Sequence, residues 1–377
     1  MLFPDARLEA WMREAYFQSR FDIGSSGVEN FQLGELCDLI GYDLSELSHL
    51  RICDSQTLGD GQLRQAIADR YADGNADRVM VTNGSTEANF LLHCAIVQPC
   101  DEIIVLEPVY QQLASLAQGL GAKNRIWRLH EEHRFAPNIE DLKYLLSSRT
   151  KAVILNFPHN PTGVTISTEQ LEQLISAIAS VNAWLIWDAA FAEIQFEGTP
   201  LPDPILQYDR AISMGTLSKA FGLPGLRVGW CIAPETILER CTSVRDYVSL
   251  HLSPLVEAIA LQVIRNAASV IANRMERVKA NLGFCSAWAN EHRDYLTWTS
   301  PQAGVCAFPR FHDRIDVDQL CKYLVREESV LLVPGSCFGF PRHARFGFGG
   351  NRSDLEEATM RLSRTLRSNQ FIERDRS

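Results

Sequence analysis

The sequence has no long apolar run, no excess of basic residues and no signal peptide pattern. None of its hydrophobic runs approaches the roughly 18 residues that cross a bilayer, and residues 1–20 carry charged side chains where a signal peptide has an unbroken apolar core. The 36 lysines and arginines are outnumbered by 46 aspartates and glutamates, which gives a formal charge of −10. Such a field repels polyanions. We therefore expect no nucleic-acid partner and no membrane partner.

The ten cysteines include no Cys-x-x-Cys pair and have no even spacing. In a chain of 377 residues this scatter is typical of reduced, buried thiols and not of a disulfide framework, so we expect a cytoplasmic protein. Residues 130–133 have the wrong spacing for a helical two-histidine zinc motif, and the aspartates at 313–318 lack the glycine of a calcium loop. No metal site is expected.

Short apolar runs alternate with segments of helical periodicity between residues 79 and 233, which predicts strands alternating with helices. The runs, which we expect to be buried parallel strands, are residues 79–81, 103–106, 153–157, 184–187 and 228–233. Between two of them, Ser167 and Gln170 form a capping box before a helix with one apolar face. The sequence thus predicts a doubly wound α/β domain with ligands at the carboxyl ends of its strands.

The last hundred residues have a different pattern, which predicts a smaller α+β domain. Its expected elements are strands at 305–309, 330–333 and 345–348, a helix with Val317, Leu320, Cys321 and Leu324 in register, and a final helix opened by Ser353 and Glu356. The N-terminal residues form an amphipathic stripe that should pack on this domain. We therefore expect an N-terminal segment at 1–45, a large domain at 46–265 and a small domain at 266–377.

One lysine, Lys219, lies among hydroxyls and glycines, with Thr216 and Ser218 before it and Arg227 after it. A lysine that forms a Schiff base needs a desolvated ammonium or a nearby positive charge. Arg227 could supply that charge and grip a phosphate, while the two hydroxyls add donors. The alternative is a surface lysine beside a glycine-rich turn.

Two further segments follow predicted strands. Gly84, Ser85 and Thr86 open a helix whose first N–H groups can bind an anion, although a strand-to-helix turn capped by Ser85 explains the same residues. Asn160 and Asp188 come at or just beyond the ends of two other strands, where side chains in an α/β fold contact ligands.

Taken in this order, these segments resemble the fold-type I enzymes that use pyridoxal 5′-phosphate (PLP), the aminotransferase class I and II superfamily, over nearly the whole chain. The resemblance implies that Lys219 forms the Schiff base with PLP and that Asp188 keeps its pyridine nitrogen protonated. It also implies that Asn160 binds the phenolic oxygen and that Tyr110 stacks on the ring. A homodimer is implied as well.

The same resemblance assigns the remaining contacts. Its expected phosphate-binding residues are Gly84, Ser85, Thr86, Thr216, Ser218 and Arg227. Arg345, with a planar fork that matches a carboxylate, is expected to bind the substrate together with Asn160 and Gly27. A surface arginine on a terminal strand is the alternative for Arg345.

Two departures from ordinary aminotransferases stand out. Asp188 is followed by Ala189, Ala190 and Phe191 where many members have Asp-Glu-x-Tyr, so a hydroxyl that would stabilise the cofactor phenolate is missing. Asp54 stands where many members carry a tyrosine that reaches the partner subunit's phosphate. A carboxylate there would attract a cation, which hints at a substrate with a positive side chain; a solvated loop aspartate is the alternative.

Longer stretches look like capreomycidine synthases and like a related cyclase of guanitoxin assembly. They are residues 8–11, 16–18, 25–28, 156–161, 215–231 and 244–247. This resemblance implies a PLP-dependent cyclodehydratase of a hydroxylated arginine, with 4-hydroxyarginine converted to enduracididine as the favoured reaction. The alternatives are a capreomycidine synthase acting on 3-hydroxyarginine, an ordinary aminotransferase, or an inert scaffold domain. A buried guanidinium needs an acidic partner, and Glu9, Glu29 and Asp54 are the candidates.

Overall fold

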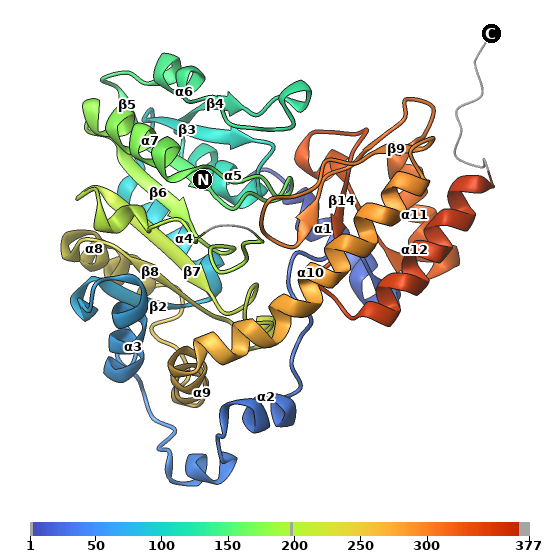
Figure 1. The fold of residues 1–377 in the computed structure, drawn as a ribbon. Helices are drawn as coiled ribbons and strands as arrows, with labels where there is room; N and C mark the ends of the chain where they lie inside the picture. Colours follow the sequence, from blue (N-terminus) through green and yellow to red (C-terminus); the bar gives the residue numbers. More distant parts are fainter. Residues whose placement is uncertain (1–2, 197–198, 369–377) are drawn as a thin grey trace.

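The computed structural model describes residues 3–196 and 199–368, and a seven-stranded mixed sheet forms the centre of the larger part (Figure 1). The strand order is β2-β8-β7-β6-β5-β3-β4. The strands are β2 (Val79–Asn83), β3 (Glu102–Glu107), β4 (Lys123–Arg128), β5 (Thr150–Asn156), β6 (Trp184–Asp188), β7 (Ala211–Thr216) and β8 (Val228–Ile232). The α/β fold class predicted from the sequence is confirmed.

The prediction of parallel pairing was wrong for residues 228–233. β8 is antiparallel to both of its neighbours, β2 and β7. A parallel return needs a long crossover, usually an α-helix, whereas β7 and β8 are joined by a loop of residues 217–227 whose only helix is the 3₁₀ turn η6 (Pro224–Leu226). Because β2 and β7 both oppose β8, they run in the same direction. β4 and β7 were not expected as strands; β4 is an edge strand with mostly polar side chains.

Helices cover both faces of the sheet, and the alternation of side chains along β2 shows why. Val79 and Val81 join the apolar cluster that contains α3 (Gly61–Tyr71) and α9 (Pro254–Arg265), while Met80 joins the cluster on the other face. That other cluster includes α4 (Gly84–Ile96) and α8 (Glu235–Arg245). The remaining helices of this part are α5 (Gln111–Gly119), α6 (Ile139–Leu145) and α7 (Thr168–Ser180). The predicted capping box of α7 is confirmed.

The smaller part follows the long helix α10 (Ala267–Glu291), which runs diagonally across the view in Figure 1. Its strands are β9 (Leu296–Thr297), β10 (Cys306–Ala307), β11 (Arg310–Phe311), β12 (Val330–Leu331), β13 (Val333–Pro334) and β14 (Ala344–Gly347), and its other helices are α11 (Val317–Glu328) and α12 (Arg352–Arg367). The four apolar residues predicted to share one face of α11 are buried, as expected. The predicted start of α12 was wrong: Asn351 is its cap, because its side chain accepts hydrogen bonds from the Ser353 and Asp354 N–H groups.

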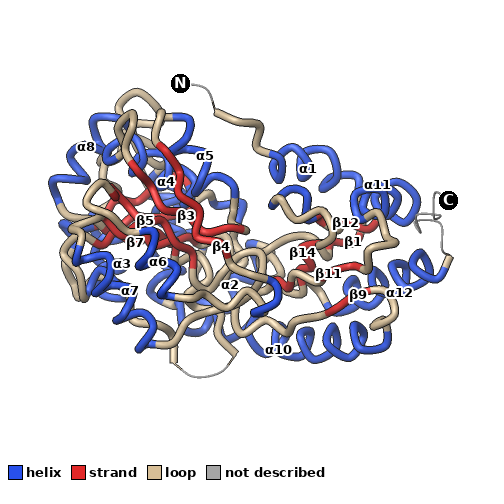
Figure 2. The backbone as a smooth tube through the Cα atoms, turned by 90° about the horizontal axis from the view of Figure 1, so that it is seen from above, coloured by secondary structure: helices blue, strands red, loops and turns tan. Residues whose placement is uncertain are grey.

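The N-terminal segment lies against this smaller part (Figure 2). α1 (Arg7–Ala15) and β1 (Phe21–Asp22) make these contacts, whereas α2 (Leu33–Ile40) packs against α10. β1 pairs in parallel with β12, and Trp11 in α1 donates to the Leu332 carbonyl. The division of the chain at residues 45 and 265 stays a prediction, and residues 1–2 and 369–377 of its outer segments lie outside the described residues.

All ten cysteines are free. Within residues 3–196 and 199–368, no single helix is long and apolar enough to cross a membrane, and α9 and α10 satisfy the length and composition criteria only as a pair bent by 73°. Those same residues contain no group of three or more His, Cys, Asp or Glu side chains placed to hold a metal ion.

Candidate active site

The carboxyl ends of neighbouring strands meet at one edge of the central sheet. Asp188 is the last residue of β6 and Thr216 the last of β7, while Gly84 directly follows β2. These strands run in the same direction, so their ends lie together, as expected for ligand-binding residues of an α/β fold. A cavity of about 720 Å³ lies at this edge.

Most of the residues predicted from the sequence line this cavity. They are Glu9, Gly27, Glu29, Ser85, Thr86, Tyr110, Asn160, Asp188, Thr216, Ser218, Lys219, Arg227 and Arg345. The walls come from the N-terminal segment, from the large sheet and from the small part near α12, so segments far apart in the sequence are brought to one place. Gly84 lies just behind the wall, at the start of α4. Asp54 does not line the cavity.

Lys219 lies between the sheet and the N-terminal segment. Its Nζ donates to Ser26 Oγ at 2.9 Å and lies 5.8 Å from the centre of the Phe191 ring. Burial, helped by the positive charge of Arg345, lowers the pKa of Lys219 from 10.5 to about 8. A lysine with such a pKa is available as a neutral amine, the form that acts as a nucleophile and a base.

Asp188 and Asn160 are buried, and hydrogen bonds that involve their backbone groups or those of their neighbours hold them in place. Burial raises the pKa of Asp188 to about 6, although the Ala190 N–H and Lys219 oppose the change. Asn156, at the end of β5, donates to the Asp188 carbonyl and accepts from the Asn160 N–H. A buried carboxylate of this kind is stabilised by a cationic partner, such as a protonated ring nitrogen.

The start of α4 and Arg227 form a cradle for an anion. Gly84 has φ +76°, a backbone conformation that favours glycine, and a Cβ built on it would lie 2.5 Å from Arg227 Nη2, so a larger residue would also displace that guanidinium. The first N–H groups of α4 have no partner within the helix, and the hydroxyls of Thr216 and Ser218 lie 3.0 Å apart on the adjoining wall. This set of donors fits the phosphate of PLP.

A buried ion pair holds the cradle from behind. Glu87, in the first turn of α4, lies 3.4 Å from Arg245, which is fully buried and donates to the Val81 carbonyl. Glu87 also accepts from the Asn83 N–H. These contacts fix the helix end relative to β2. Residues 244–247 belong to a stretch that resembles capreomycidine synthases, but no local motif predicts this role for Arg245.

Arg345, on β14, is 3% exposed, so its interpretation as a surface arginine is wrong. Its Nε donates to the Gly24 carbonyl at 3.0 Å, and its Nη1 lies 3.4 Å from Asn160 Oδ1. The guanidinium thus lines the cavity next to Asn160, where it can bind a carboxylate. Across the cavity, Tyr110 donates to Glu9 at 2.9 Å.

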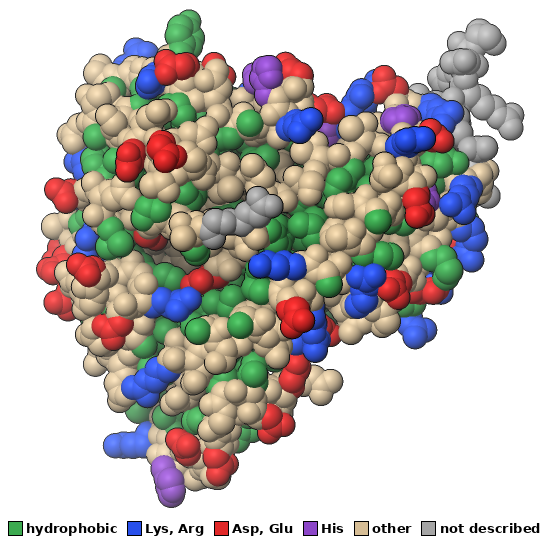
Figure 3. Space-filling model, in the orientation of Figure 1, with side chains coloured by type: hydrophobic (Ala, Val, Ile, Leu, Met, Phe, Trp, Pro, Cys, Tyr) green, Lys and Arg blue, Asp and Glu red, His purple; other side chains and the backbone are tan. Residues whose placement is uncertain are grey.

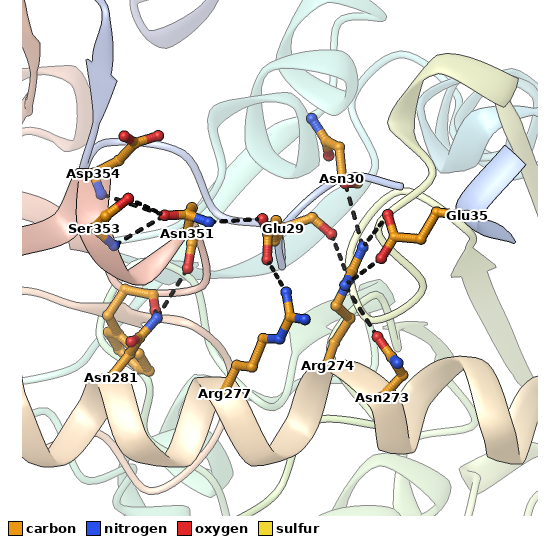
Figure 4. Close-up of polar contacts among 12 residues, drawn as sticks. Glu29, Asn30, Glu35, Asn273, Arg274, Arg277, Asn281, Asn351, Ser353 and Asp354 are labelled. Carbon is orange, nitrogen blue, oxygen red and sulfur yellow. Dashed lines mark hydrogen bonds and ion pairs between the residues drawn. The ribbon is translucent and has the colours of Figure 1, made fainter. Parts of the chain in front are cut away.

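The three acids considered for a guanidinium differ in their surroundings. Glu9 lines the cavity and is exposed, Glu29 lines it and is tied into a network, and Asp54 points into solvent 3.3 Å from His251. Figure 4 shows Glu29 between Arg277 of α10, at 2.6 Å, and Asn351, at 3.1 Å. These hydrogen bonds lower the pKa of Glu29 although partial burial alone would raise it.

Several polar residues of the cavity were not predicted from sequence, and three of them bear on the site. Ser26 contacts Lys219, Asp22 ends β1, and Asp354 lies in the first turn of α12. Of these three, only Ser26 had a signal, since residues 25–28 belong to a stretch that resembles capreomycidine synthases. The two aspartates have no local motif, because the strand pairing of β1 with β12 brings one of them to the site and the end of α12 brings the other.

The chain matches known proteins over most of its length. The family model described as aminotransferase class I and II matches residues 55–362. A protein of Streptomyces vinaceus named capreomycidine synthase is 42% identical over 96% of this chain and 94% of its own length. An aspartate aminotransferase of Thermotoga maritima is 28% identical over 81% of each chain.

Solved structures agree with these matches. The PLP-dependent cyclase OrfR has a TM-score of 0.91 and 38% identity, covering 98% of both chains. A PLP-dependent aminotransferase from Streptococcus suis has a TM-score of 0.93 and 26% identity over the full length of both chains. The sequence matches cover most of the chain, the fold agrees with them, and the site fits the cofactor. The chain belongs to the PLP-dependent aminotransferase class I and II family.

Proposed function

We propose that this chain is a PLP-dependent cyclase that closes a hydroxylated L-arginine into a cyclic guanidino amino acid with loss of water. The observation that carries the proposal is the charge of the cavity. Arg345 offers a buried fork for the α-carboxylate, and besides Asp188, which would face PLP, four carboxylates, those of Glu9, Asp22, Glu29 and Asp354, line the same space. An amino acid with a cationic side chain complements this arrangement.

Each residue of the site would have a separate task. PLP, when bound, withdraws electrons from the bond between Cα and its hydrogen in the bound amino acid. The start of α4, Arg227 and the two hydroxyls of β7 and its turn would hold the phosphate. Asp188 would keep the ring nitrogen protonated, Asn160 would bind the phenolic oxygen, and Tyr110 would stack on the ring.

Lys219 would move the proton. With its pKa lowered to about 8, it reaches the neutral form near physiological pH, so it can take the proton from Cα and return it. Ser26 holds its Nζ at 2.9 Å and would orient it. Arg345 would fix the substrate carboxylate, which leaves the side chain facing the acids of the cavity.

We infer that 3-hydroxyarginine is the substrate, in place of the 4-hydroxyarginine favoured by the sequence analysis. The 42% identity to a protein named capreomycidine synthase supports this change. So does the chemistry: a hydroxyl on Cβ leaves once the Cα proton is removed, whereas a hydroxyl on Cγ also requires removal of a Cβ proton. The route through Cγ would thus need a base for a second proton, and among the described residues that line the cavity Lys219 is the single lysine.

The test is incubation of the holoenzyme with 3-hydroxyarginine, 4-hydroxyarginine or arginine, without a keto acid, in D₂O. We expect 3-hydroxyarginine to give a cyclic product that has lost one water and carries deuterium at Cα, identified by NMR and mass spectrometry. Conversion of 4-hydroxyarginine alone would support the enduracididine-forming reaction. A stoichiometric need for a keto acid, or an open-chain 2-keto acid as sole product, would refute the cyclase and support an aminotransferase.

A homodimer is part of the proposal. Tyr247 is 92% exposed and Ile52 is 75% exposed, and the His251–Asp54 contact places their two loops side by side. Exposed apolar side chains gathered on one surface are typical of an interface. We expect a mass twice that of the chain in analytical ultracentrifugation, in a cytoplasmic protein whose thiols stay reduced.

A further inference from the structure

A turn formed by residues 22–26 connects an acid of the cavity with the groups that would handle the substrate. Asp22 Oδ1 accepts from the Gly24 N–H at 2.9 Å and from the Ser25 N–H at 2.8 Å. The Gly24 carbonyl accepts from Arg345, and Ser26 accepts from Lys219. The carboxylate of Asp22 is therefore held in a fixed place within the same short turn that contacts the carboxylate-binding arginine and the lysine.

Asp22 has capacity left for a cation. Among the residues that the structure describes, it makes no ion pair within 4.0 Å, and its hydrogen bonds all fall on Oδ1. It lines the same cavity as Lys219 and Arg345. Arg20 lines the same cavity, but it is exposed and lies over the Phe21 ring at 5.2 Å.

The other acids of the cavity are less suitable. Both oxygens of Glu29 are occupied, one by Arg277 and one by Asn351 (Figure 4). Glu9 is exposed and accepts from Tyr110. Asp354 is exposed in the first turn of α12, on the side of the small part.

Cyclisation requires a bent substrate. A terminal guanidine nitrogen must approach a carbon two or three bonds from the α-carboxylate, so the guanidinium must fold back toward the reacting atoms and cannot extend to the cavity mouth. The acid that holds it should then lie beside the groups that bind the other end of the substrate. Asp22 satisfies this condition through its turn.

We propose that Asp22 binds the substrate guanidinium and holds the side chain in the bent conformation that ring closure needs. This inference rests on the proposed function for the identity of the substrate. It makes Asp22 a specificity-determining residue, one that was absent from the acids considered from sequence. Its free oxygen would accept from the guanidinium while its other oxygen keeps the turn.

The test is binding of three amino acids to the holoenzyme by isothermal titration calorimetry: L-arginine, its neutral isostere L-citrulline, and L-norvaline, which has no polar end. The variant is Asp22→Asn, whose amide oxygen can still accept from the Gly24 and Ser25 N–H groups and so preserve the turn. We expect wild type to prefer arginine over citrulline, and Asp22→Asn to lose about 30-fold or more in arginine affinity while norvaline affinity changes by less than about threefold.

Asp354→Asn is the matched control, because it removes the same charge from the same cavity; we expect it to weaken arginine binding only a few-fold. The inference is overturned if Asp22→Asn binds arginine as wild type does, if it loses norvaline affinity to the same extent, or if Asp354→Asn shows the large loss instead. Because arginine binding needs no turnover, failure of the cyclase reaction with an Asp22-dependent preference for arginine would refute the proposed function alone.

Discussion

The cavity has a buried inner end, at Asp188 and Arg345, and a partly exposed mouth, at Glu29. The two ends differ in how their charges are compensated. At the inner end, Asp188 and Arg345 are buried beside Asn160, and the charges of the two ionic side chains are only partly compensated by the protein itself. At the mouth, Glu29 is compensated by Arg277 and by Asn351. Buried, incompletely paired charge is expensive, and it is retained where a ligand completes the pairing. The comparison therefore separates residues that bind ligands from residues that shape the entrance.

The pKa values follow the same division. Burial raises the pKa of Asp188 to about 6 and lowers that of Lys219 to about 8, so both charged forms are disfavoured at the inner end. At the mouth, hydrogen bonds lower the pKa of Glu29 in spite of its partial burial. PLP and substrate would therefore stabilise the charges of the inner end, whereas the charge of Glu29 at the mouth is already stabilised without them.

The largest effect should come from Lys219→Ala. The variant loses both the covalent partner of PLP and the base, so we expect turnover to fall by about 10⁴-fold or more and the absorbance of the lysine-bound cofactor to disappear. Circular dichroism should show a folded protein, because Lys219 makes a single side-chain hydrogen bond, to Ser26. Full turnover by the variant would mean that Lys219 is neither the covalent partner of PLP nor the base.

The next effect concerns the rate at which the apoprotein takes up PLP, followed by absorbance as a function of pH. Only the neutral amine of Lys219 reacts, and its fraction rises with pH through a pKa of about 8. We expect the rate to increase about tenfold per pH unit below pH 8 and to level off above it, whereas an ordinary lysine would still be accelerating near pH 10.

The charge of Arg345 supplies a control for this profile. Since Arg345 is the second cause of the lowered pKa, after burial, Arg345→Gln should move the midpoint to higher pH. Arg277→Gln, which removes an equal charge from the mouth, should leave the midpoint in place. A profile that is identical in all three proteins would mean that the charge of Arg345 does not act on Lys219.

The inner end could be predicted from sequence, whereas at the mouth Glu29 was a candidate but its partners were not, for a physical reason. Lys219, Asp188 and Gly84 lie in contiguous motifs at the ends of strands, so local pattern and fold class together place them. The Glu29 network joins residues 29, 277 and 351, which meet only because α10 and α12 pack beside the N-terminal segment. The direction of β8 was missed for a similar reason, since strand pairing depends on the connection and not on the apolar run itself.

The smallest effect should come from Glu29→Gln, which tests whether the mouth only shapes the entrance. The side chain of Glu29 is 24% exposed and that of Arg277 is 55% exposed, so solvent screens their ion pair and it should stabilise the fold by less than about 1 kcal/mol. Asn351 contributes more through its cap on α12 than through its bond to Glu29. We therefore expect Glu29→Gln to reduce kcat/KM less than about tenfold.

A double-mutant cycle of Glu29→Gln with Arg277→Gln, measured by urea unfolding, isolates this pair from the rest of the network. The coupling should be below about 1 kcal/mol and should weaken as salt is added, because the two groups are partly in solvent. If Glu29→Gln instead abolished arginine binding while unfolding stayed normal, Glu29 would be a guanidinium ligand. Arg277 would then be its positioning partner, and the boundary between the inner end and the mouth would have to move outward to include both residues.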